Sequence, residues 1–117
     1  EDSNSAVQVL ERDKRDALKA QDKTELIGYE GMASNAYFEV LPILILNQKT
    51  DFPFHGRNRR PPKDAVNAML SFAYTLIAND VAAALETVGL DPYVGFLHTL
   101  RPGRTSLALD MMEELRA

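Results

Sequence analysis

The chain has 117 residues, about the size of one domain, and its 45% hydrophobic and 26% charged residues are ordinary for a soluble globular protein. It contains no cysteine, which excludes structural disulfides and thiolate metal sites and makes a reducing cytoplasm the expected location. The formal net charge of −4 argues against a general nucleic-acid binder, although a local basic patch is what meets phosphates.

Both ends of the chain suggest a piece of a longer protein. The start, Glu1-Asp2-Ser3-Asn4, is polar, lacks an initiator Met and does not resemble a signal peptide. The last apolar-periodic segment reaches Ala117 with no capping residue after it. We expect residues 1–117 to form a single α-helical domain.

Two helices are predicted before residue 47. The first is amphipathic and spans about Ser5 to Ala20. The spacing of Asp22 and Glu25 fits a capping box that opens the second. This second helix runs into a continuous apolar segment, residues 40–46, where Pro42 should kink or end it.

Residues 47–63 are predicted to form a long loop, because they contain three prolines and a glycine and have no helical period. Asp64 then caps a third helix, from about Ala65 to Val88, which is apolar on most sides and is therefore expected to be the central buried helix. Its polar residues are spaced four apart and interrupt the apolar surface, which argues against a membrane span. The four that share this spacing are Asn67, Ser71, Thr75 and Asn79.

Gly89 is predicted to end the third helix. A short apolar segment, residues 93–100, follows a turn at Asp91-Pro92, and residues 101–104 form a second turn. Thr105 or Ser106 then caps a last helix that continues to the end of the chain. With no strand alternation and no internal repeat, the fold class is all-α.

The last helix carries candidate metal ligands. On a helical wheel its apolar residues fill one arc, while Asp110, Glu113 and Glu114 fill the opposite one. Asp110 and Glu113 are one turn apart, so their carboxylates could converge on one ion. The alternative is a solvated acidic face.

Two further residues could join such a site. His98 lies in an apolar stretch just before a turn, where it is either a core or cap residue or a metal ligand near the acids of the last helix. Glu30 lies between Gly28 and Gly31 in a helix, and each glycine costs roughly 1 kcal/mol relative to Ala. Close approach of another helix would offset that cost and leave Glu30 half-buried; a simple kink with Glu30 facing water is the alternative.

Basic residues gather in the two long connections and suit phosphate oxygens. They are Arg57, Arg59, Arg60 and Lys63 in the loop, with His55 beside them, and Arg101 and Arg104 in the later turn. The alternative is a solvated loop whose arginines pair with the protein's own acids. Phe52 and Phe54 precede the basic run and either pack the loop down or stack on bases.

Taken together, four motifs in order resemble those of a known family. They are Gly28-Tyr29-Glu30-Gly31; Arg57-Asn58-Arg59-Arg60-Pro61-Pro62-Lys63-Asp64 with Asn67; Gly95-Phe96-Leu97-His98; and Arg101-Pro102-Gly103-Arg104 followed by residues 106–114. The family is that of the CRISPR-associated spacer integrases, the universal endonucleases of CRISPR adaptation. The resemblance covers about residue 25 to the C-terminus. Ala65 departs from it, since many members have Pro after the Asp.

The resemblance implies a site for Mg²⁺ or Mn²⁺ in a multi-helical C-terminal catalytic domain, with Glu30, His98 and Glu113 as ligands and Asp110 supporting them. It implies a homodimer that binds double-stranded DNA and a small second adaptation protein. The reaction would insert foreign DNA into the CRISPR array by attack of a DNA 3′-hydroxyl on the repeat. Members also carry an N-terminal β-rich domain, which these residues lack, so the piece alone could be inactive.

Two other functions remain open from the residues themselves. One is a non-catalytic helical interaction module whose acids and arginines are solvated faces. The other is a different metal-dependent phosphodiesterase, which would cleave phosphodiesters without joining a DNA end to a repeat.

Overall fold

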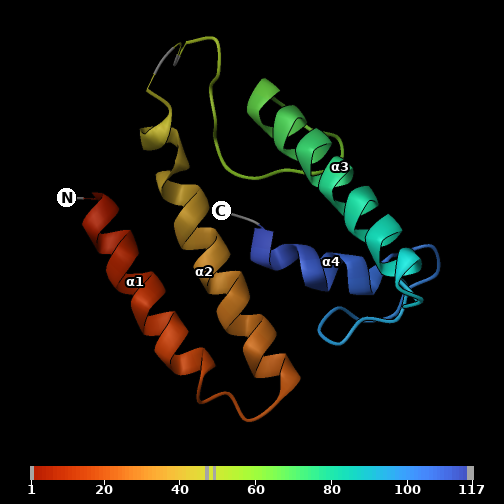
Figure 1. Ribbon diagram of the computed structural model, residues 1–117. Coiled ribbons are helices and arrows are strands. Elements are labelled where there is room, and N and C mark those ends of the chain that lie inside the picture. Colours follow the sequence, from red (N-terminus) through yellow and green to blue (C-terminus); the bar gives the residue numbers. More distant parts are fainter. Residues whose placement is uncertain (1, 47, 49, 116–117) are drawn as a thin grey trace. The chain divides into compact units, whose positions relative to one another are not determined.

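A computed structural model describes residues 2–46, 48 and 50–115, and these residues contain helices and no strand (Figure 1). The helices, in chain order, are α1 (Asp2–Ala17), α2 (Lys23–Leu44), α3 (Ala65–Thr87), α4 (Ser106–Met112) and the 3₁₀-helix η1 (Glu113–Leu115). The all-α prediction is therefore confirmed. The predicted end of the last helix, at residues 116–117, lies outside the described residues.

The chain divides into two compact units, Glu1–Ala68 and Met69–Ala117. The first holds α1, α2, the long loop and the first turn of α3; the second holds the rest of α3, the later turns, α4 and η1. That the two units form one domain stays a prediction.

In the first unit, α1 and α2 pack side by side as an antiparallel pair (Figure 1). α1 ends three residues earlier than the predicted Ala20, where turn hydrogen bonds replace the helical pattern, Lys19 N to Asp16 O at 3.0 Å among them. Its buried residues include Ala6 and, less expectedly, Asp13. Neither carboxylate oxygen of Asp13 has a hydrogen-bond partner among the described residues, and Arg12 lies 3.7 Å away.

The predicted capping box opens α2. Asp22 Oδ1 accepts from the backbone N–H of Glu25 at 2.8 Å, and Glu25 returns the contact by accepting from Gln21 N at 2.9 Å. Pro42 lies inside the helix, and α2 ends two residues after it, at Leu44, as expected for a residue that removes one helical hydrogen bond.

The long loop is anchored to α2 by Phe54. Its side chain is buried, and its ring centroid lies 6.2 Å from that of Phe38. Packing is therefore the role of Phe54, rather than stacking on bases. At the far end of the loop, Asp64 Oδ1 accepts from Asn67 N at 2.7 Å and so caps α3, as predicted.

Gly89 ends α3 as predicted. Its φ of +79° is in the left-handed region, and two hydrogen bonds close the turn, Leu90 N to Leu85 O at 2.9 Å and Gly89 N to Glu86 O at 3.0 Å. This is the Schellman pattern, which satisfies the last carbonyl groups of the helix.

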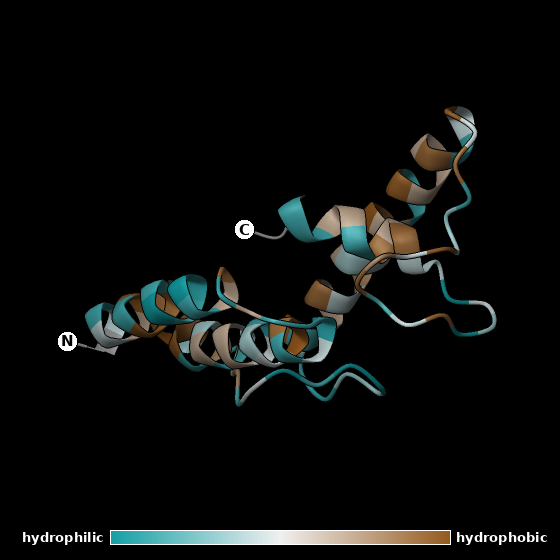
Figure 2. Ribbon diagram, turned by 90° about the horizontal axis from the view of Figure 1, so that it is seen from below, coloured by the Kyte–Doolittle hydropathy of each residue, from teal (hydrophilic) through white to brown (hydrophobic). Residues whose placement is uncertain are grey.

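The prediction that α3 is a buried central helix is wrong for the described chain. Phe72 is 66% exposed and Met69 54%, although both lie in the apolar stretch of the helix. Hydrophobic residues run along α3, whereas α1 is largely hydrophilic (Figure 2). By length and composition alone α3 could also cross a membrane, which is weak evidence because core helices of soluble proteins pass the same test.

Candidate functional site

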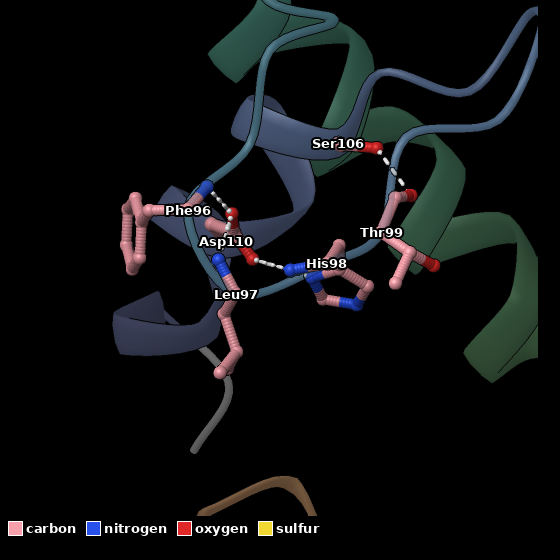
Figure 3. A network of polar contacts seen from close by, with 6 residues as sticks. All are labelled: Phe96, Leu97, His98, Thr99, Ser106 and Asp110. Carbon is pink, nitrogen blue, oxygen red and sulfur yellow. Dashed lines mark hydrogen bonds and ion pairs between the residues drawn. The ribbon is translucent and has the colours of Figure 1, made fainter. Parts of the chain in front are cut away.

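In the second unit, the side chain of Asp110 joins α4 to the segment 96–98 (Figure 3). One carboxylate oxygen, Oδ2, accepts from the backbone N–H of Phe96 at 2.6 Å and of Leu97 at 2.9 Å. The other, Oδ1, accepts from His98 N at 2.8 Å and lies 2.5 Å from His98 Nδ1. Asp110 is only 5% exposed, so a single buried carboxylate fixes three consecutive residues.

Gly95 allows this close fit. A Cβ at that position would lie 2.6 Å from Asp110 Oδ2 and 2.8 Å from Ser106 Cβ, distances that real atoms do not reach. Ser106 is itself fully buried, and its hydroxyl donates to Thr99 O at 3.1 Å. The segment 96–99 is thus bonded to α4 at both ends, by Asp110 at Phe96 and by Ser106 at Thr99. The close packing of Gly95 against Ser106 and Asp110 leaves no room for a side chain at residue 95.

The hydrogen bonds keep Asp110 ionised. Burial raises the pKa of Asp110, but the bonds from the His98 side chain and from the three backbone N–H groups outweigh it, so the pKa lies below the ordinary value of 3.8. An ionised Asp110 is an acceptor only, so the proton at the short contact belongs to His98 Nδ1.

This arrangement determines which nitrogen of His98 is available to a ligand. With Nδ1 engaged by Asp110, a neutral imidazole has its free lone pair on Nε2, and the His98 side chain remains 22% exposed. A carboxylate bound to the far nitrogen is the usual partner of a metal-ligating histidine, because it fixes the tautomer and the ring orientation. The pair therefore has the arrangement that a metal-ligating histidine requires, and the role of His98 as a ligand stays a prediction.

The helical-wheel prediction for the last helix is wrong at Asp110. The wheel places Asp110 with Glu113 and Glu114 on the arc opposite the apolar residues, but the buried residues of α4 are Ser106, Ala108, Asp110 and Met112. Asp110 points inward because the segment 96–98 supplies donors for both oxygens. Convergence of Asp110 and Glu113 on one ion is therefore not what this unit shows.

The other predicted ligands lie on different elements. Glu113 begins η1, immediately after α4, while Glu30 lies in α2 of the first unit and is exposed. Within the described ranges, no group of three or more Asp, Glu or His side chains could hold a metal ion. The set Glu30, His98 and Glu113 spans the two units and stays a prediction.

The glycines beside Glu30 lack the predicted close neighbour. At both Gly28 and Gly31, nothing lies within 4 Å of the place where a Cβ would stand. Within the first unit, therefore, no close neighbour offsets the cost of these glycines, and Glu30 is exposed.

The two kinds of glycine predict opposite mutational effects. Gly31→Ala is expected to stabilise the chain by about 0.5–1 kcal/mol, because alanine is the better helix former and no atom opposes its methyl group. Gly95→Ala is expected to destabilise it by about 1–3 kcal/mol, because the methyl group meets Asp110 and Ser106. Urea unfolding followed by circular dichroism measures both, and equal effects of the two variants would contradict the contact at Gly95.

The basic residues differ in their surroundings. Arg57 is half-buried and donates through Nη1 to Asn58 O at 2.6 Å and to Asn67 Oδ1 at 2.9 Å, so it belongs to the structure of the loop. Arg59, Arg60, Lys63 and Arg101 are exposed, and Arg104 is half-buried. None of these contacts tests a role in binding phosphates, which stays a prediction for all six.

Comparisons with a family model and with individual proteins point to the same family. The family model described as "CRISPR associated protein Cas1" matches residues 1–117. A CRISPR-associated endonuclease Cas1 of Leptospira interrogans is 50% identical over 116 residues, which are 99% of this chain and 46% of that protein. A second, from Rhodospirillum rubrum, is 59% identical over 97 residues, covering 83% of this chain and 28% of that protein.

Two solved structures share the fold. A CAS1 protein from Thermotoga maritima matches with a TM-score of 0.78 and 36% identity, over 89% of this chain and 33% of that one. A casposase bound to integration product matches with a TM-score of 0.71 and 27% identity, over 98% and 36%. The chain thus spans less than half the length of these relatives. With its full length matched by the family model, the chain belongs to the Cas1 family of CRISPR-associated proteins.

Proposed function

We propose that this chain supplies the catalytic residues of a divalent-metal-dependent DNA endonuclease and integrase of CRISPR adaptation, which inserts foreign DNA into the CRISPR array by phosphodiester transesterification. Membership of the Cas1 family and relatives named as CRISPR-associated endonucleases support the proposal. The similar casposase, solved with its integration product, supports the joining reaction.

The observation that carries the proposal is the contact between Asp110 and His98 Nδ1 at 2.5 Å. It leaves the lone pair of His98 Nε2 available to a metal ion in a fixed direction, on a side chain that is still partly exposed. A histidine that served packing alone would not need a buried, ionised carboxylate to orient it, since burying that charge is itself costly.

The residues have separate roles in this proposal. His98 through Nε2, with Glu113 and Glu30, would hold Mg²⁺ or Mn²⁺, and one imidazole among oxygen ligands favours Mn²⁺. Such an ion supplies Lewis acidity at the scissile phosphate and lowers the pKa of the attacking hydroxyl or water. Asp110 is the positioning residue: it holds the His98 ring and keeps the proton on Nδ1.

The cationic side chains would hold the DNA. Arg59, Arg60 and Lys63 of the loop and Arg101 and Arg104 of the later turn are the candidates for phosphate contacts. Arg57 would act mainly by shaping the loop. The proposal includes double-stranded DNA, a second copy of the protein and a small second adaptation protein as partners, in the cytoplasm of a prokaryotic cell.

Calorimetric titration with Mn²⁺ tests the metal site on this chain. Glu113→Ala is expected to weaken Mn²⁺ binding by at least about tenfold, because it removes a carboxylate ligand. Glu114→Ala is the matched control: it removes the same group one residue further along η1, where the side chain is exposed, and should bind as the unmodified chain does. Equal binding by both variants and the unmodified chain would contradict the role of Glu113.

A second candidate function is a non-catalytic helical interaction module. The exposed apolar residues of α3, Phe72 and Met69 among them, favour it, because such a surface is typical of a contact with another protein. The two functions differ in the same titration: an interaction module binds no Mn²⁺ in any variant. A phosphodiesterase of another kind would bind Mn²⁺ and cleave DNA but leave no product joined to a repeat.

A further inference from the structure

A second hydrogen-bonded centre lies in the first unit, around the side chain of Asn67 at the start of α3. This side chain is fully buried. Its Nδ2 donates to Gly56 O at 2.9 Å and to Asp64 Oδ2 at 2.7 Å, and its Oδ1 accepts from Asn58 N at 2.8 Å and from Arg57 Nη1 at 2.9 Å. Both donor hydrogens and both lone pairs of the amide are therefore in use, which no other polar side chain of similar size could reproduce.

These bonds close the segment 56–64 upon itself. Gly56 and Asn58 lie at one end of the segment and Asp64 at the other, and Asn67 bonds to all three. Gly56 has a φ of +107°, which favours glycine, and Asn58 Oδ1 accepts from Lys63 N at 2.7 Å. The loop is thus fixed by specific contacts, although it contains no regular secondary structure.

The closed segment concentrates positive charge. It contains four cationic residues and one acid, a formal charge of +3 in a chain whose total is −4. Of these five charged residues, Arg57 and Asp64 bond to the side chain of Asn67. Arg59, Arg60 and Lys63 are exposed.

We propose that Asn67 is a positioning residue that holds Arg59, Arg60 and Lys63 as a preformed phosphate-binding surface. The inference rests on the proposed function, which makes DNA the ligand. Long cationic side chains on a mobile loop lose conformational freedom on binding, and a loop already fixed by Asn67 avoids the backbone part of that loss. Affinity for DNA should therefore depend on a residue that contacts no DNA.

The test is binding of a short fluorescent DNA duplex to this chain, measured by anisotropy over a range of KCl concentrations. Asn67→Ala is expected to weaken binding by about tenfold, because the backbone of the loop must then be ordered when DNA binds. Asn79→Ala is the matched control, because it changes the same residue type in the same polar row of α3 at an exposed position, and it should leave binding unchanged.

A double-mutant cycle separates positioning from general loss of stability. The pair Arg60→Ala and Lys63→Ala should lower the slope of log affinity against log salt by about 0.9 for each phosphate that the protein no longer neutralises. If Asn67 acts through these cations, adding Asn67→Ala to that pair has little further effect. If Asn67 only stabilised the fold, the losses of affinity caused by Asn67→Ala and by the pair would add. The folded fraction of Asn67→Ala would then show the same salt slope as the unmodified chain. Asn58→Ala removes the bond to Lys63 N, leaves the side chain of Asn67 in place, and should weaken binding in a chain that stays folded.

The possible failures are distinguishable. If Arg60→Ala with Lys63→Ala binds DNA as the unmodified chain does, the loop is not a phosphate-binding element, and this inference falls together with that part of the proposed function. If that pair weakens binding but Asn67→Ala and Asn58→Ala match Asn79→Ala, the positioning role alone is overturned.

Discussion

Asp110→Asn is expected to destabilise the chain by about 2 kcal/mol or more. The amide keeps one acceptor oxygen, so it cannot serve the two pairs of contacts that Oδ1 and Oδ2 make with the segment 96–98. Hydrogen bonds to a charged group contribute about 1.5–3 kcal/mol, and buried N–H groups left without an acceptor add to the loss. Urea unfolding at neutral pH measures the difference.

Asp91→Asn is the control for this variant. Asp91 is exposed and accepts one backbone hydrogen bond, from Tyr93 N at 2.9 Å, so its replacement should cost less than about 1 kcal/mol. Equal losses in the two variants would mean that the buried contacts of Asp110 add nothing to stability.

The stability from Asp110 should also depend on pH. Because its pKa is lowered in the folded chain, the contribution is fully present above the ordinary pKa of 3.8 and is lost as the pH falls through the lowered value. The difference in unfolding free energy between the unmodified chain and Asp110→Asn should therefore be constant near neutral pH and shrink in acid. A difference that grows in acid would contradict the sign of the shift.

Much of the fold follows from local sequence signals. Asp22 with Glu25, Asp64 and Gly89 mark helix ends, and each makes the hydrogen bonds that its residue type favours. These interactions span only a few residues, so the local sequence is enough to predict where these helices begin or end. The exposure of α3 was not predictable in this way, because burial depends on what covers a helix and its composition alone does not show that.

The candidate site was only partly predictable for the same reason. A helical wheel treats α4 alone and therefore places Asp110 beside Glu113, whereas the donors that turn Asp110 inward come from residues more than ten positions earlier. Gly95 was a usable signal, since a glycine directly before an apolar run often marks close backbone approach. Asn67 carried a similar signal: an amide near the start of an apolar helix needs partners if it is buried.

The division between ligand and positioning residue gives the last prediction. His98→Ala in the full-length protein is expected to abolish metal-dependent DNA cleavage, because it removes a metal ligand. Asp110→Asn removes only the residue that orients this ligand, so it should reduce cleavage by about 10- to 100-fold. His98→Ala should nevertheless fold, because Asp110 Oδ1 keeps its bond to the backbone N–H of residue 98, so its thermal unfolding separates lost chemistry from lost structure.

His55→Ala is the matched control for this variant, because His55 is the other histidine of the chain and is exposed on the basic loop. Cleavage should fall in the order His55→Ala, Asp110→Asn, His98→Ala, with the first close to the unmodified protein. Added imidazole should restore part of the activity of His98→Ala and none of that of Asp110→Asn, because only the former lacks a nitrogen ligand. Cleavage by His98→Ala at the unmodified rate would remove His98 from the site, and with it the reason to regard the buried carboxylate of Asp110 as more than a structural contact.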